Sequence, residues 1–90
     1  MASAPDRIWP VTIAFTEDDR TTRADAILDV GGRHYHGWGR ARRNPSDPDV
    51  RVIGEEVAAA RALRHLAEQL FSEAERDIEE IEHQPVHLHR

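Results

Sequence analysis

The 90-residue chain contains no cysteine and no lysine, and each absence narrows what it can do. Without cysteine the chain has no disulfides, no thiolate nucleophiles and no cysteine-based zinc sites. All 12 basic residues are arginine, and guanidinium groups suit planar recognition of phosphate or carboxylate and stacking on aromatic rings. The base composition of a genome would produce the same bias.

Long apolar segments are also missing. Residues 1–7, MASAPDR, lack the apolar core of a signal peptide, and no apolar run reaches the roughly 18 residues that cross a bilayer. We therefore expect a cytoplasmic protein with no membrane partner.

Charge and length limit the function further. The 17 acidic residues exceed the basic ones and give a net charge of -5, whereas a general nucleic-acid coat needs a strongly basic domain. Any nucleic-acid binding must therefore be local. A chain of 90 residues makes a single domain with a small core, and such chains are often helped by dimerisation.

Three alternating segments predict strands at about 8–16, 20–30 and 33–43. Gly31 and Gly32 between the last two favour a two-residue hairpin, because glycine readily adopts positive φ. This hairpin would pair Leu28 with Tyr35. If residues 17–20 form a four-residue turn, Phe15 would face Thr22. Pro10 cannot donate to a ladder, so the first strand lies at an edge or begins pairing after that residue.

A loop at 44–53 precedes a long helix predicted over about 55–83, with a tail at 84–90. Gly54 is the expected N-cap, and Glu55 and Glu56 suit the positive end of the helix dipole. Ser72 resembles the start of a capping box, where the helix would kink or restart. The predicted apolar stripe consists of Val57, Ala60, Leu63, Leu66, Ala67, Leu70, Phe71, Ala74, Ile78 and Ile81. The expected fold class is α+β with the order β-β-β-α: a three-stranded antiparallel sheet with one long C-terminal helix packed on one face.

Alternation separates the two faces of the third strand. Tyr35, Gly37 and Gly39 belong to the face under the helix, while His36, Trp38 and Arg40 point the other way. Three interpretations of this outer face compete. Arginines around an aromatic ring suit phosphate contact with base stacking, whereas exposed tryptophan and arginine also suit a subunit interface. The third interpretation is a solvated face with weak ion pairs. The candidate nucleic-acid-binding residues are Arg23, His36, Trp38, Arg40, Arg42 and Arg43.

Catalytic and metal sites are not expected. The pairs His34/His36 and His87/His89 have no common partner that would complete the roughly four ligands of a zinc site. No nucleophile with an orienting base stands out. We therefore expect a non-enzymatic protein with no cofactor, no metal and no small-molecule substrate.

The charges are also unevenly distributed along the chain. Residues 68–82 carry seven acids and one arginine, while residues 33–43 carry four arginines and no acid. A polar distribution of this kind favours head-to-tail self-association or presentation of the basic end to RNA.

Three segments resemble a family of small actinobacterial proteins of unknown function: ADAILDVGGRHYHGWGRARRNPSDPDV, GEEVAAARALRHLAEQL and DIEEIEHQPVHL. The resemblance implies a fold similar to the double-stranded-RNA-binding-domain class and a homodimer. Dormancy-induced members are likened to ribosome hibernation promoting factor, which implies a stress-linked association with the ribosome or RNA. The alternative is a homodimeric protein-interaction or structural module that binds no nucleic acid.

Overall fold

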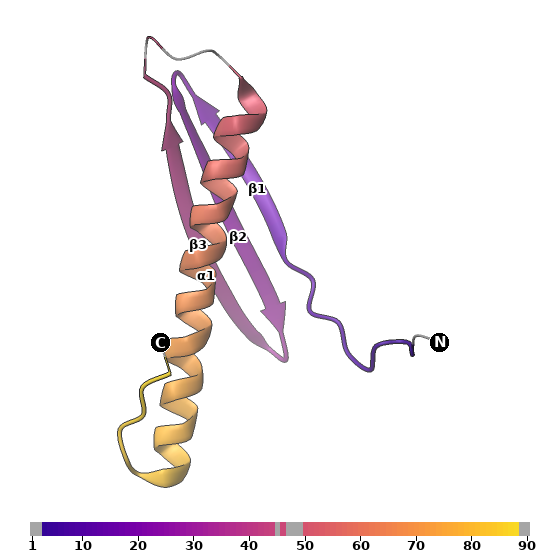
Figure 1. The fold of residues 1–90 in the computed structure, drawn as a ribbon. Coiled ribbons are helices and arrows are strands. Elements are labelled where there is room, and N and C mark those ends of the chain that lie inside the picture. Colours follow the sequence, from indigo (N-terminus) through magenta and orange to yellow (C-terminus); the bar gives the residue numbers. More distant parts are fainter. Residues whose placement is uncertain (1–2, 45, 47–49, 89–90) are drawn as a thin grey trace.

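The computed structural model describes residues 3–44, 46 and 50–88. Three antiparallel strands, β1 (Thr12–Asp18), β2 (Thr21–Val30) and β3 (Arg33–Arg42), form a sheet in that order and precede one helix, α1 (Arg51–Glu82) (Figure 1). The predicted α+β class with the order β-β-β-α is therefore confirmed. The expected loop at 44–53 and the tail at 84–90 fall partly outside the described residues.

The hairpin between β2 and β3 has the predicted register. Gly31 and Gly32 take positive φ values of 58° and 77°, the conformation that a two-residue hairpin turn requires. Leu28 pairs with Tyr35 and Ala26 with Gly37. This part of the fold follows directly from local turn chemistry.

The predicted position of the first strand is wrong by several residues. β1 begins at Thr12 rather than near residue 8, and Phe15 pairs with Ala24 rather than Thr22. The turn contains two residues instead of four because Asp19 adopts a φ of 51°, a left-handed conformation that aspartate tolerates. A shift of two residues keeps the same side chains on the same face.

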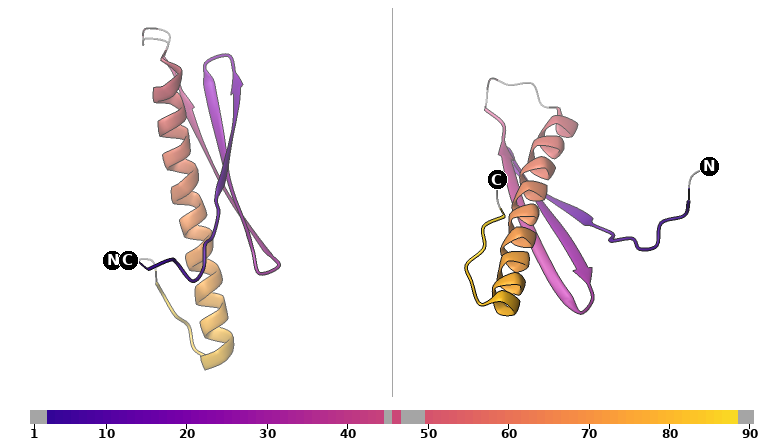
Figure 2. Two further views of the ribbon diagram at one scale, coloured as in Figure 1. Left: turned by 90° about the vertical axis from the view of Figure 1, so that its right-hand side faces the viewer. Right: turned by 60° about the horizontal axis from the view of Figure 1, so that its bottom comes forward.

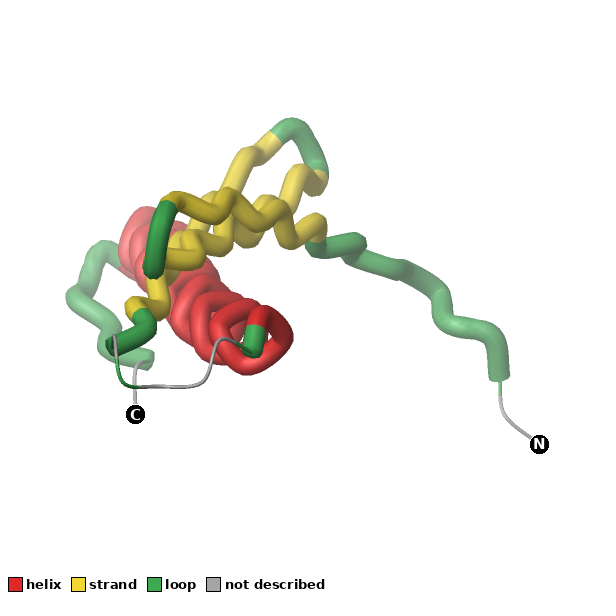
Figure 3. Tube along the Cα trace, turned by 90° about the horizontal axis from the view of Figure 1, so that it is seen from above, coloured by secondary structure: helices red, strands yellow, loops and turns green. Residues whose placement is uncertain are grey.

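Residues 3–11 form an arm that leads away from the sheet and the helix (Figures 1 and 3). Ile8 and Trp9 on this arm are largely exposed. Pro10, which has no N–H to donate, separates them from the paired part of the strand.

The helix crosses one face of the sheet over β2 and β3 (Figure 2). The buried apolar residues are few and mostly small: Ala24, Ala26, Leu28, Ala58, Ala62 and Leu66. A Cβ on Gly37 would lie 2.3 Å from the backbone nitrogen of Leu66, and one on Gly39 would lie 2.6 Å from that of Ala62. Glycine on β3 therefore allows direct contact between strand and helix backbones.

The predicted start of α1 is also wrong. The helix begins at Arg51 after Val50 as N-cap, so Gly54 lies inside it and the two glutamates lie beyond the first turn. A Cβ on Gly54 would lie 3.1 Å from Oγ1 of Thr22, which indicates a packing role rather than a capping role. The helix continues through Ser72 and ends at Glu82, where His83 takes a left-handed φ of 59°.

The predicted apolar stripe combined two faces of α1. Ala58 and Ala62, which the prediction omitted, are buried against the sheet with Leu66, whereas Leu63 and Phe71 are 42% and 43% exposed. Close approach of the backbones favours alanine on the sheet side, so the larger side chains lie elsewhere on the helix. We name the exposed set Ile53, Val57, Leu63 and Phe71 the outer stripe.

Side chains of α1 cover the free edge of β3. The backbone N–H of Trp38 donates to Nδ1 of His65 at 3.0 Å, and Arg61 donates to the carbonyl of Arg40 at 2.7 Å. After α1 the chain folds back, because the N–H groups of Val86 and Leu88 donate to carboxylates of the helix. Within the described residues, no helix is both long and apolar enough to cross a bilayer.

Candidate functional site

The solvent face of the sheet carries a compact polar and aromatic group on β2 and β3. Register places Asp25 opposite Trp38, Arg23 opposite Arg40, and His36 next to Asp25 on the diagonal. We name these five residues the outer-face cluster. Four of them were predicted site residues, and Asp25 is the fifth member of the cluster.

Trp38 is the centre of the outer-face cluster. Its side chain is 40% exposed, and the guanidinium carbons of Arg23 and Arg40 lie 4.7 and 5.6 Å from the ring centroid. These distances are within the range of cation–π attraction. The edge contact with His65, at 6.3 Å between centroids, connects the indole to α1.

Asp25 holds the cluster together. Its carboxylate accepts two hydrogen bonds from Nε of Arg23, at 3.1 and 3.3 Å, and a third from the terminal nitrogen at 3.0 Å. Nε2 of His36 lies 2.7 Å from the same carboxylate. Hydrogen bonds from Arg23 and then His36 hold the pKa of Asp25 below its ordinary value, and the same contact raises the pKa of Arg23. The charged state of both groups is therefore favoured.

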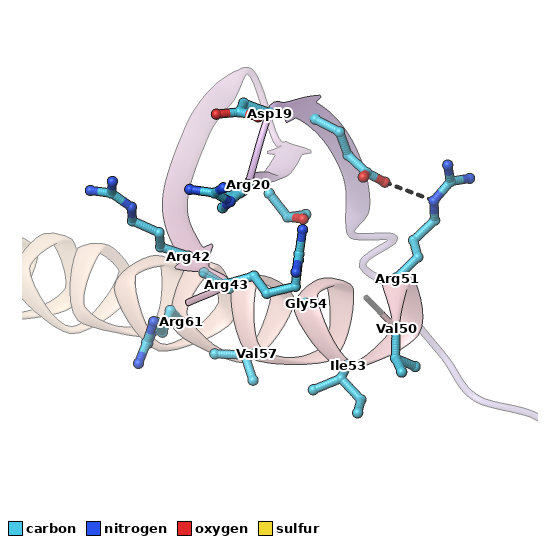
Figure 4. A pocket seen from close by; sticks show the side chains of 13 residues that line it. Asp19, Arg20, Arg42, Arg43, Val50, Arg51, Ile53, Gly54, Val57 and Arg61 are labelled. Carbon is cyan, nitrogen blue, oxygen red and sulfur yellow. Dashed lines mark ion pairs between the residues drawn. The ribbon is translucent and has the colours of Figure 1, made fainter. Parts of the chain in front are cut away.

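Arg42 and Arg43, the two remaining predicted residues, lie at the end of the sheet instead. There the ends of β1 and β3, the start of β2 and the first turns of α1 surround a hollow of about 380 Å³ (Figure 4). We name it the arginine pocket, and its basic lining residues are Arg20, Arg42, Arg43, Arg51 and Arg61. Sequence alternation could not join Arg20, Arg51 and Arg61 to this group, because Arg20 lies in the turn between β1 and β2 and the other two lie on α1.

The opposite end of the molecule is acidic. Arg33, beside the hairpin turn, pairs with Asp77 at 2.8 Å and lies 3.8 Å from Glu73. The hydrogen bond to Asp77 raises the pKa of Arg33. These contacts fasten the hairpin to the acidic half of α1, so Arg33 lies apart from Arg42 and Arg43, which line the arginine pocket at the start of the helix.

His34 and His36 each lie next to an aspartate of β2. His34 contacts Asp29 through Nδ1, and His36 contacts Asp25. Among residues 3–44, 46 and 50–88, no group of three metal-ligating side chains comes together. His89 lies outside the described residues.

Known proteins that are similar to this chain include relatives from mycobacteria. Rv2632c of Mycobacterium tuberculosis is 47% identical over 76 residues, which cover 84% of this chain and 82% of the relative. Mb1767 of Mycobacterium bovis is 40% identical over 80 residues, covering 89% of this chain and 85% of the relative. The crystal structure of Rv2632c matches with a TM-score of 0.81 and 42% identity, and the match covers 93% of this chain and 100% of that chain.

The profile of one protein family also matches almost the whole sequence. It is described as Rv2632c-like and spans residues 7–87. That span includes the outer-face cluster, the arginine pocket and all four secondary-structure elements. This chain therefore belongs to the Rv2632c-like family.

Proposed function

We propose that this protein is a non-enzymatic, cytoplasmic factor that associates with RNA or the ribosome under stress or dormancy. The observation that carries the proposal is Trp38, exposed on the sheet face between two guanidinium groups. The link to stress or dormancy and the comparison with hibernation factors come from the family resemblance. The β-β-β-α order also favours a relationship to the double-stranded-RNA-binding-domain class.

The chemistry of the outer-face cluster suits single-stranded RNA. A base stacks on an exposed aromatic ring regardless of its identity, and nearby arginines contact the phosphates. Because Asp25 already binds Arg23, Arg40 is the residue of the cluster best placed to meet a phosphate. His36 lies on the same face of β3 as Trp38 and Arg40 and belongs to this surface.

The test is co-sedimentation with ribosomes and with single-stranded RNA at about 50 and about 200 mM salt. We expect binding to weaken as salt rises, because phosphate contacts release counterions. Trp38→Ala should remove about 1–3 kcal/mol of binding free energy through lost stacking, and Arg40→Ala should reduce the salt dependence.

Arg76→Ala is the matched control for the loss of one arginine. Arg76 lies in the acidic half of α1 and pairs with Glu73 at 3.4 Å, so its removal should leave RNA binding unchanged. Absence of the protein from ribosomes and RNA at both salt concentrations would exclude the proposed function.

A second candidate, a homodimeric interaction module, is favoured by the amount of apolar surface left exposed. The outer stripe of α1 faces solvent, and Phe15 on β1, with Val11 just before it, is also more than one third exposed. The radius of gyration is 17.0 Å, whereas a compact chain of this length would have about 12 Å. A small core and a large exposed apolar surface favour burial against another molecule.

A second copy of this chain is the partner we infer. In an antiparallel pair of α1 helices that buries both outer stripes, the acidic residues beyond Phe71 would extend past the start of the other helix, where Arg42, Arg43 and Arg51 lie. Charge complementarity would therefore fix the orientation while the outer stripes are buried. Such a dimer uses the helix side of the molecule and leaves the outer-face cluster available, so dimerisation and RNA binding do not compete.

Leu63→Glu tests the dimer by placing a charge within the outer stripe. We expect the wild-type protein to sediment at twice the 10.3 kDa chain mass and the variant to sediment as a monomer, because burial of an unpaired carboxylate is costly. Gln84→Glu adds the same charge at an exposed position of the tail and should remain dimeric. A wild-type protein that stays monomeric at every concentration would exclude this arrangement.

A further inference from the structure

Asp25 is the negatively charged member of the outer-face cluster, and it lies directly opposite Trp38 in the register. The N–H of Trp38 donates to His65 of α1 rather than to β2. Asp25 and Trp38 therefore form the type of antiparallel pair that is not hydrogen-bonded and whose side chains lie closest together. A carboxylate beside the ring repels an approaching phosphate. An acid at this position weakens the attraction of the surface for phosphate.

Asp25 binds Arg23 through one edge of the guanidinium group. Nε and one terminal nitrogen of Arg23 both donate to the carboxylate, over distances of 3.0 to 3.3 Å. The five N–H donors of a guanidinium group have a fixed planar arrangement, so this contact also fixes the direction of the side chain. The guanidinium carbon lies 4.7 Å from the ring centroid of Trp38. Asp25 thus holds Arg23 against the indole.

His36 adds a second contact to the same carboxylate. Its Nε2 atom lies 2.7 Å from Oδ1 of Asp25. The Asp25 side chain is 22% exposed, against 42% for Arg23 and 40% for His36. Partial burial strengthens a hydrogen-bonded ion pair, because water and salt screen it less. Release of Arg23 from Asp25 is therefore unfavourable unless another anion replaces the carboxylate.

The ion pair changes the charge that a ligand meets at Trp38. The charges of Arg23 and Asp25 offset each other, whereas the guanidinium carbon of Arg40 lies 5.6 Å from the same ring centroid. A polyanion without bases would therefore contact one guanidinium group at the ring rather than two. A base can still stack on the exposed part of the indole. The arrangement favours a ligand that offers an unpaired base together with a phosphate.

We propose that Asp25 is a specificity-determining residue that withholds Arg23 from phosphates, so that binding depends on an unpaired base at Trp38. The surface would then select single-stranded RNA over polyanions that lack accessible bases. This role rests on the proposed binding of RNA at the outer-face cluster. Asp25 acts through Arg23 and is therefore a positioning residue.

Asp25→Asn tests this role, because it keeps the shape of the side chain and removes its charge. The probes are a single-stranded RNA oligonucleotide and inorganic polyphosphate, which has phosphates but no bases. We expect the variant to bind polyphosphate roughly threefold to tenfold more tightly than the wild type does at about 50 mM salt. The gain should be smaller for RNA, because a stacked base already fixes where its phosphates lie. The preference for RNA over polyphosphate should therefore fall.

Salt dependence reports the release of Arg23 separately from any change in shape. One more phosphate contact should steepen the dependence of log affinity for RNA on log salt by about 0.7. The advantage of Asp25→Asn over the wild type should therefore shrink about 2.5-fold between about 50 and about 200 mM salt. The double variant Arg23→Gln/Asp25→Asn should lose this advantage, because the released guanidinium group is absent. Circular dichroism confirms that each variant is folded.

Asp29→Asn is the matched control for the loss of one carboxylate on this face. Asp29 also lies beside a histidine, His34. It is four residues from Asp25, about 13 Å along the strand, which exceeds the Debye length of about 10 Å at 0.1 M salt. At about 200 mM salt this variant should bind both probes like the wild type.

A lower preference for RNA in Asp25→Asn, reversed in the double variant and absent from Asp29→Asn, would support this role. Wild-type preference and salt dependence in Asp25→Asn would overturn it while leaving RNA binding itself intact. An equal gain in Asp29→Asn, or a gain that persists in the double variant, would also overturn it, because net charge rather than release of Arg23 would be the cause. Absence of RNA binding by the wild type at both salt concentrations would remove the proposed function and this role together.

Discussion

Gly37→Ala is expected to lower the free energy of unfolding by about 3 kcal/mol, the upper end of the usual cost of overpacking. The added Cβ would lie 2.3 Å from the backbone nitrogen of Leu66 and 2.5 Å from the carbonyl oxygen of Ala62. These atoms belong to the helix backbone, so no side-chain rotation can relieve the clash. Either α1 must move away from β3 or the strand must bend. Urea denaturation followed by circular dichroism measures the loss.

Gly31→Asn is the matched control for replacement of a glycine. A Cβ at Gly31 meets nothing within 4 Å, and asparagine tolerates the positive φ of a hairpin turn. Its stability should remain close to that of the wild type. Equal stabilities of Gly37→Ala and the wild type would show that the close contact between β3 and α1 does not exist in solution.

Leu28→Ala should cost about 2–5 kcal/mol, the usual range for truncation of a buried leucine. Leu28 is 1% exposed and is the largest fully buried side chain among the residues that the structure describes. Most of its buried apolar companions are alanines, which have no flexible side chain to refill the cavity. Because a small domain is stable by only about 5–15 kcal/mol, we expect a large fall in the urea midpoint.

Ile81→Ala removes the same number of carbon atoms at a site that is 78% exposed. It should change the unfolding free energy by less than about 0.5 kcal/mol, as surface substitutions usually do. If the two variants were equally stable, the core would not be centred on β2.

The hairpin was predictable from sequence because its determinants are local. Gly31 and Gly32 define the turn, and strict alternation then assigns Leu28 to the core and Trp38 to solvent. β1 was harder to place, since its register depends on whether Asp19 enters the left-handed region. Two turn lengths gave the same faces, so the apolar pattern could not decide between them.

On α1 the periodicity of apolar residues does not identify which face of the helix packs on the sheet. Ala58 and Ala62 contact the sheet because Gly37 and Gly39 bring the backbones together, while Leu63 remains exposed on another face. A pattern search gives leucine more weight than alanine, so the predicted stripe included Leu63 and omitted Ala58 and Ala62. Gly54 was mistaken for a cap because its packing partner, Thr22, lies on a distant strand.

Local sequence patterns predicted one part of the candidate site, whereas the rest depends on side-chain geometry and on the tertiary fold. Strand alternation and register were sufficient to place Arg23, Trp38 and Arg40 together. The interaction of Asp25 with both Arg23 and His36 needed side-chain geometry. The arginine pocket needed the tertiary fold, because Arg20 and Arg61 are close only after α1 crosses the sheet.

The cover that His65 and Arg61 place over one side of β3 also limits how copies can assemble. A filament built by strand addition requires two receptive edges on every molecule. Here the N–H of Trp38 and the carbonyl of Arg40 on β3 are already bonded to side chains of α1. Another strand could therefore pair with this part of β3 only by displacing His65 and Arg61.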